Sequence, residues 1–243
     1  MLRIVGPGQC IRNLHVAFIG ICAALLVVSG PVMCAKKQAT AETTETKIIA
    51  SDVSSDKMST SESPLGDLFA DAIRESVKAD IALIASSEIR SKTPVSISST
   101  KSPEEISSLV NYPEDTVTVI LITGKQLMAA LEQSVSSYPK PTLRFLQVSG
   151  LSFTFDPAKV QGSRVIKVTI GEDNLAPLTK YTVAVTRSLA RGALGYWKVW
   201  SRDNIKAPDN TPTVVDAVSN YLKQNTSLDY SKLDRIIIAG QTK

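Results

Sequence analysis

The chain has 243 residues, of which 43% are hydrophobic and 21% are charged, and its formal net charge is +4. This length allows one sizeable core, or one large domain with a tail, and the composition is typical of a globular protein. So small a net charge gives no electrostatic footprint for nucleic acid, which we exclude as a partner.

Histidine and cysteine are confined to the start of the chain. The single histidine is His15, and the three cysteines are Cys10, Cys22 and Cys34. The chain after residue 35 therefore offers no imidazole base, no Ser-His triad, no cysteine nucleophile and no His or Cys metal ligand. We expect no catalytic residue, no metal, no cofactor and no disulfide in this part of the chain.

Residues 1–35 have the pattern of a signal peptide. Arg3 and Arg12 precede an uncharged apolar stretch at 16–33, and no acidic residue occurs. The stretch is also long enough to span a bilayer as an uncleaved membrane anchor. We favour cleavage near Cys34 or Ala35, and lipidation of Cys34 is a third outcome. Removal of this segment lowers the formal net charge from +4 to +2.

Residues 36–61 are rich in Thr, Ser, Ala and charged residues, and we interpret them as a flexible linker. Such a linker would hold a folded domain at 62–243 away from a membrane or wall. The sequence thus predicts an exported protein that is periplasmic, extracellular or membrane-anchored facing outward. Any contact with a membrane would be through the N-terminal segment, if it stays uncleaved.

The domain opens with a predicted helix and a predicted strand. Ser63 can cap a helix that has Pro64 at its first position, and an apolar stripe follows it to Val77. The apolar run at 79–86 predicts a strand directly after this helix. Ser102 and Glu105 have capping-box spacing and predict a short helix through Val110.

The rest of the chain alternates between strand and helix signals. Residues 116–123 predict a strand, and Thr123 can cap a helix at 124–135. From Leu143 the period changes to that of short strands with tight turns between them. Further elements follow as a strand at 181–186, a helix at 213–224 and a closing strand at 235–240. This mixed order predicts an α+β fold, a mixed sheet with flanking helices.

Four stretches together resemble a known family in wording, order and spacing. They are GDLFADAIRESVKADIALI, TVTVILITGKQLMAALEQ, FLQVSGLSFTFDPAKVQGSRVIKVTI, and KYTVAV leading to GALGY. The chain from Ser63 to Tyr196 resembles the C-terminal domain of the 5′-nucleotidases, and RIIIAG is similar to that domain's terminal strand.

The resemblance implies a fold and a division of labour. In that family the C-terminal domain recognises the nucleotide, whereas a separate N-terminal metallophosphatase domain hydrolyses the phosphoester with two metal ions. That chemistry needs Asp, His and Asn ligands to activate a water. We expect this chain to hold no such domain, and hence no phosphoesterase activity of its own.

The family's nucleotide-binding motifs are altered in this sequence. An Asn-Gly-Gly-Gly-Ile-Arg loop follows the first strand in typical members, and only Ile89 and Arg90 match it here. The family's two stacking aromatic positions fall on Pro113, one place from Tyr112, and on Ser188; Leu194 stands where an Asp would bind ribose. The degenerate family positions are therefore Ala85, Ser86, Ser87, Glu88, Pro113, Ser188 and Leu194.

The candidate ligand-binding residues are Arg90 and Tyr112. Arg90 could contact an anion at the end of a strand. It could instead be a solvated arginine, or one paired with Glu88 or a nearby acid, and we favour these interpretations without a ligand. The Glu88 carboxylate is expected to repel a phosphate. Tyr112 could replace the missing ring, or be half-buried structure. We expect the aromatic cluster at 196–200 to serve packing.

We thus expect an exported binding or interaction module with the family's fold, and a weak nucleotide or nucleoside ligand. Two alternatives remain open. The chain could be an accessory subunit that completes the active site of a separate metallophosphatase chain, or a structural envelope protein.

Overall fold

The computed structural model describes residues 53–90, 102–206, 211–225 and 227–241, with the backbone of two short strands at 47–48 and 96–97. All of these residues belong to one compact unit, Glu42–Lys243. The proposed leader at 1–35 lies outside the described residues, as does the first part of the expected linker.

The central sheet has four strands in the order β5 (Val117–Thr123), β10 (Lys180–Thr186), β3 (Ile81–Ala85) and β6 (Leu146–Ser149). β10 runs parallel to β3 and antiparallel to β5, and β6 runs antiparallel to β3. All five residues of β3 are buried, because helices or a second sheet cover both faces.

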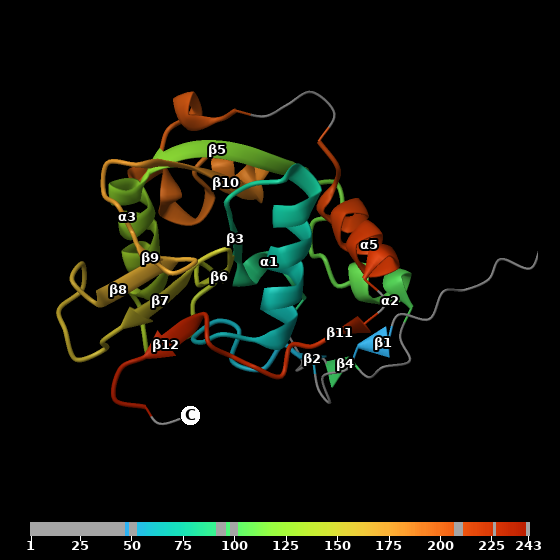
Figure 1. Cartoon of the computed structure of the whole chain (residues 1–243), viewed down its shortest axis with the longest axis horizontal. Coiled ribbons are helices and arrows are strands. Elements are labelled where there is room, and N and C mark those ends of the chain that lie inside the picture. Colours follow the sequence, from blue (N-terminus) through green and yellow to red (C-terminus); the bar gives the residue numbers. More distant parts are fainter. Residues whose placement is uncertain are drawn as a thin grey trace, which may run out of the picture. The chain divides into compact units, whose positions relative to one another are not determined.

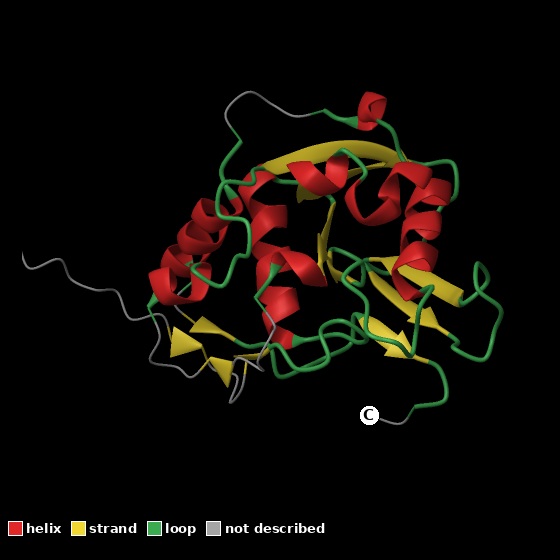
Figure 2. Cartoon of the chain, turned by 180° about the vertical axis from the view of Figure 1, so that it is seen from behind, coloured by secondary structure: helices red, strands yellow, loops and turns green. Residues whose placement is uncertain are grey.

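The central sheet separates two apolar cores. Side chains alternate along β3, so Ala82 and Ile84 enter the core beneath α1 (Pro64–Val77) and α5 (Val214–Gln224). Ile81 and Leu83 enter the other core, which holds α3 (Gly124–Val135). Figures 1 and 2 show α1 and α5 side by side, with α2 (Pro103–Ser107) next to α5.

A second sheet lies against α3. Its order is β12 (Ile236–Ile238), β7 (Ser152–Phe155), β8 (Val165–Ile170) and β9 (Asp173–Asn174). β12 is parallel to β7, whereas β7, β8 and β9 are antiparallel neighbours. The α+β prediction is confirmed, with two mixed four-stranded sheets instead of one. Two pairs of two-residue strands complete the sheets: β1 (Lys47–Ile48) with β11 (Ser227–Leu228), and β2 (Val53–Ser54) with β4 (Ser96–Ile97).

Residues 53–61, expected in the linker, pack against the folded domain. Val53 and Met58 are fully buried in the core beneath α1. The buried amide of Gln147 on β6 donates to the carbonyl oxygens of Met58 at 2.9 Å and Ser61 at 2.8 Å. The amide N–H of Ser63 donates to the side-chain oxygen of the same glutamine at 3.0 Å. The folded part therefore includes residues upstream of the expected boundary at 62.

A partly buried ion pair fastens the start of β12 to α1. The Arg235 guanidinium donates to both carboxylate oxygens of Asp71, at 2.8 and 2.9 Å, and to the carbonyl oxygen of Val148 at 3.0 Å. The buried Glu62 carboxylate accepts from the amides of Arg235 at 3.0 Å and Ile236 at 2.9 Å. We call these residues the Arg235 clamp. Among the described residues, no helix is both long and apolar enough to cross a membrane.

Candidate functional site

Four loops meet at one edge of the central sheet. Because β3 and β10 are parallel and β5 and β6 run the other way, the C-terminal ends of β3 and β10 lie beside the N-terminal ends of β5 and β6. The loops at this edge span 86–90, 111–116, 187–195 and 141–145. All of the family's altered motif positions lie at this edge.

The loop after β3 begins with the short 3₁₀ helix η1 (Ser86–Glu88). The amide and hydroxyl of Ser86 donate to the carbonyl oxygens of Phe145 at 2.8 Å and Thr142 at 2.9 Å. The amide of Ser87 donates to the carbonyl oxygen of Leu143 at 3.2 Å. These bonds hold η1 against the loop before β6, where the family has a glycine-rich backbone.

Glu88 points into the protein, contrary to the expectation that it repels a phosphate in solvent. Its side chain is 5% exposed. One carboxylate oxygen accepts from the amide of Ala85 at 2.9 Å, and the other accepts from the hydroxyl of Thr186 at the end of β10. Burial raises the pKa of the Glu88 carboxyl from 4.5 to about 7, with a further rise from the charge of Asp115; the two hydrogen bonds oppose this shift. We call this arrangement the Glu88 latch, since it joins η1 to β10.

Arg90 faces solvent and is not paired with Glu88. Its amide donates to the carbonyl oxygen of Leu109 at 2.7 Å, and Ile89 forms an antiparallel bridge with Val110. Within the described ranges no ion pair involves the Arg90 guanidinium. Of the two interpretations without a ligand, a solvated arginine fits these contacts and the Glu88 partner is wrong, because that carboxylate is turned inward.

Tyr112 is 57% exposed, so more than half of this residue is open to solvent. The neighbouring Pro113 is also exposed. The phenol ring and the Arg90 backbone belong to adjoining segments, because the amide of Asn111 donates to the carbonyl oxygen of Glu88 at 2.9 Å.

Asp115 joins the two loops that carry the family's aromatic positions, and no pattern in the sequence singled it out. One carboxylate oxygen accepts from the amide of Thr116 at 2.9 Å, and the other accepts from the amide of Ser188 at 3.3 Å. Arg187 adds a bond from its guanidinium to the Thr116 hydroxyl at 2.9 Å. The segments of Pro113 and Ser188 therefore lie together, although neither residue supplies a ring.

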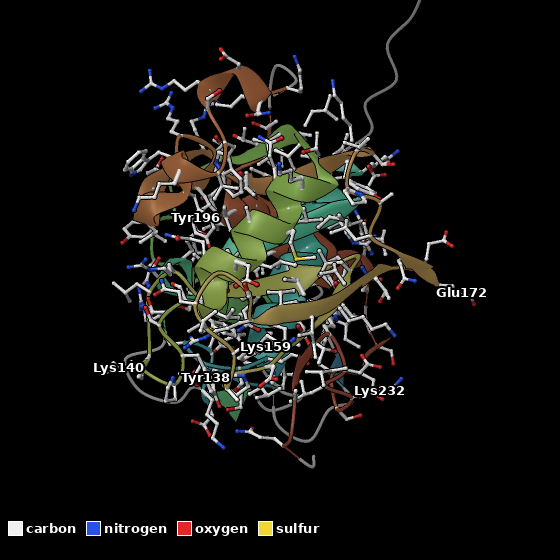
Figure 3. All side chains as sticks on the ribbon, turned by 90° about the vertical axis from the view of Figure 1, so that its left-hand side faces the viewer. Tyr138, Lys140, Lys159, Glu172, Tyr196 and Lys232 are labelled. Carbon is white, nitrogen blue, oxygen red and sulfur yellow. The ribbon has the colours of Figure 1, made fainter. Side chains whose placement is uncertain are left out.

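Leu194 lies in the 3₁₀ segment η2 (Ala193–Lys198), with a left-handed φ of 58°. A leucine there offers no acceptor to a ribose hydroxyl. The packing expectation for the aromatic cluster is confirmed for Tyr196, which Figure 3 labels, and for Trp200. Both are buried and their rings stack at 5.0 Å. It is wrong for Trp197, which is 67% exposed.

In the described part of the chain, no three His, Cys, Asp or Glu side chains lie close enough together to hold a metal ion. The loops at this end of the central sheet instead present arginines and an exposed tyrosine.

The two mixed sheets and their flanking helices define the class of protein, an α+β domain with the fold of the 5′-nucleotidase C-terminal domain. The family model of the 5′-nucleotidase C-terminal domain matches residues 37–201, and the chain belongs to that family.

Individual relatives agree with this assignment. The chain is 30% identical to an apyrase of Aedes albopictus, in a match that covers 51% of this chain and 23% of the apyrase. It is 27% identical to a human 5′-nucleotidase, in a match that covers 45% of this chain and 20% of the human protein. A solved 5′-nucleotidase precursor from Thermus thermophilus has a TM-score of 0.72 and 25% identity, over 82% of this chain and 40% of that one. The chain thus spans a minor part of each relative.

Proposed function

We propose that this chain works as a binding or interaction module that does not hydrolyse phosphoesters on its own. The Glu88 latch carries this proposal. In the place of the family's glycine-rich loop the chain has a serine-rich 3₁₀ turn, and its carboxylate is committed to Ala85 and Thr186. That loop has lost the open backbone with which the family approaches a nucleotide.

A weak nucleotide or nucleoside ligand remains part of the proposal. Arg90 and Tyr112 would supply one cation and one ring at the sheet edge, where both are exposed. The absence of a second stacked ring would cost about 1–3 kcal/mol. An unpaired ribose hydroxyl at Leu194 would cost about 1–3 kcal/mol more. Together these losses would weaken a micromolar site by about 30-fold to 20,000-fold, to a dissociation constant of about 30 μM to 20 mM.

The test is phosphate release by the purified chain. AMP, a UDP-sugar and a cyclic nucleotide are each incubated with the chain and a divalent metal ion, beside an enzyme-free blank. We expect release no faster than in the blank. Sustained turnover that is lost in Arg90→Ala would overturn the proposal, because it would show both hydrolysis and a working nucleotide site.

Calorimetry with the same nucleotides and their nucleosides separates a weak binder from a structural envelope protein. Millimolar binding that is weakened by Arg90→Ala and Tyr112→Ala supports a ligand-binding module. If the heats at millimolar ligand equal the heats of dilution alone, the chain does not bind these ligands, and a structural envelope role is favoured.

An accessory subunit is the second candidate, favoured by the size of the relatives. The chain corresponds to 40% of the Thermus 5′-nucleotidase precursor and 23% of the mosquito apyrase, so in those proteins further chain accompanies this domain. A separate metallophosphatase chain would be the equivalent partner. Adding the purified chain to the N-terminal part of the Thermus protein should then raise AMP turnover, and unchanged turnover would count against this role.

Export is proposed from the leader pattern at 1–35. Mass measurement of the chain from a native membrane and secreted fraction separates the three fates. A start near Cys34 or Ala35 indicates cleavage, retention of Met1 indicates an anchor, and added acyl mass on Cys34 indicates lipidation. Recovery of the intact chain from the cytoplasm alone would contradict export.

A further inference from the structure

An open cleft of about 580 Å³ lies beside the candidate site. Its walls are the loop before β6, residues 141–144, and the η2 segment, from which Leu194, Gly195, Trp197 and Lys198 contribute; Gln133 of α3 completes the lining. This volume is within the range of small-molecule pockets, roughly 300–1,000 Å³. Apart from Leu194, none of the altered motif positions lines it.

Buried contacts hold the two walls in place. The Tyr196 hydroxyl, on a fully buried ring, donates to the carbonyl oxygen of Arg144 at 2.8 Å and so joins η2 to the other wall. The stacked Trp200 is itself fixed by a bond from its Nε1 to the carbonyl oxygen of Leu189 at 3.0 Å. A cleft with fixed walls loses little conformational entropy when it binds a ligand.

A tight turn packs closely against Trp197. Gly192 has a φ of +91°, and a Cβ there would approach the Cβ of Trp197 to 2.6 Å. Only glycine therefore allows this close turn. Two large apolar side chains, Trp197 of η2 and Leu143 of the loop before β6, line the cleft with exposed fractions of 67% and 64%.

The charged side chains that line the cleft are both positive. Arg144 and Lys198 line it, and none of the described lining residues is acidic. The Lys198 ammonium lies over one face of the Trp197 ring, 5.5 Å from its centroid, so a ligand ring would stack on the other face. An anionic group would meet two cations here, and a planar ring would meet the indole face.

We propose that this cleft binds a small organic anion that carries a planar ring, with Trp197 stacking on the ring and Arg144 and Lys198 contacting the anionic group. The three residues that would contact the ligand lie outside the family's nucleotide motifs, although Leu194 of those motifs also lines the cleft. The proposal does not depend on phosphoester hydrolysis or on a partner chain.

The test uses the whole chain and three probes that separate ring from charge. 2-Naphthoate has both features, 2-naphthylmethylamine has the same ring with a positive charge, and cyclohexanecarboxylate has the negative charge without an aromatic ring. The two tryptophans give two indole N–H signals in a ¹⁵N spectrum, which Trp197→Phe assigns. We expect naphthoate to move the Trp197 signal saturably and to leave the signal of buried Trp200 in place. The other two probes should bind at least tenfold more weakly.

Variants test the same assignment by calorimetry. Trp197→Ala and Lys198→Ala should each weaken naphthoate binding at least tenfold. Lys180→Ala and Leu178→Ala are matched controls, an exposed lysine and an exposed leucine outside the cleft, and should bind as the natural chain does. Trp197→Phe keeps a planar ring and should restore most of the affinity, which a merely disrupted fold would not.

Three results would overturn the proposal. Naphthoate could leave the Trp197 signal unmoved up to millimolar concentration. The cationic amine could bind as tightly as naphthoate, which would exclude a role for the two cations. Trp197→Ala could bind naphthoate as the natural chain does, which would place any binding elsewhere.

Discussion

The Glu88 latch and the Arg235 clamp both bury carboxylates, but they compensate the buried charge in different ways. In the clamp, Asp71 faces a guanidinium at 2.8 and 2.9 Å, so a cation balances the anion. In the latch, Glu88 has one hydroxyl and one amide as partners and no cation, and its pKa rises to about 7. The comparison indicates that a carboxylate with a cation beside it ties two elements together as an ion pair, whereas a carboxyl buried without a cation has a raised pKa.

Removing the cation of the clamp should have the largest effect. Arg235→Ala leaves Asp71 without its ion-pair partner, and the nearby Asp67 carboxylate loses its cation too. We expect the free energy of unfolding to fall by about 3–5 kcal/mol. Denaturant unfolding followed by circular dichroism measures it.

Lys232→Ala is the matched control, because its ion pair with Asp234 is exposed. This change should cost no more than about 1 kcal/mol. An equally small loss for Arg235→Ala would contradict the assigned role of the clamp.

Removing the titrating group of the latch should change the pH dependence of stability. The pKa of Glu88 is higher in the folded state, at about 7, than in the unfolded state, at 4.5. The contribution of this carboxyl to stability is therefore fully present below pH 4.5 and is lost as the pH rises through about 7. The difference in unfolding free energy between pH 4.5 and pH 8 should include about 3 kcal/mol from this group. Glu88→Gln should lack that part, measured by urea unfolding across the pH range.

Glu114→Gln, at an exposed glutamate near the same edge, is the control for this pH series. It should keep the slope of the natural chain. If Glu88→Gln also keeps that slope, Glu88 does not titrate in the interior.

Arg90→Ala should have the smallest effect on stability. Its side chain is exposed and is not the partner of Glu88, so the unfolding free energy should change by about 0.5 kcal/mol or less. Thermal unfolding detects this. A loss above about 1 kcal/mol would mean that Arg90 takes part in the latch after all.

Local signals in the sequence predicted the helices because caps are formed within one turn. The Ser63, Ser102 and Thr123 side chains accept from the amides three residues later, as expected from their spacing. The fold class followed from the order of elements and from the family resemblance.

The interior of the candidate site could not be predicted in this way, since its contacts join distant segments. Glu88 and Thr186 are 98 residues apart, so the sequence alone could not show that this carboxylate turns inward. Likewise the Gln147 amide reaches the carbonyl of Met58, 89 residues away, and brings the expected linker into the fold. Trp197 and Trp200 stand three places apart, and their spacing does not show that one is exposed and the other buried against Tyr196.

The central claim is that the family's nucleotide loop has become an interior latch in this chain. A pH titration of the Glu88 side-chain carboxyl by ¹³C NMR, assigned with Glu88→Gln, tests it most directly. We expect a midpoint near 7, displaced upward from 4.5 by burial. A midpoint at or below 4.5 would contradict the claim, because it would mean a solvated carboxylate that is free to face a ligand.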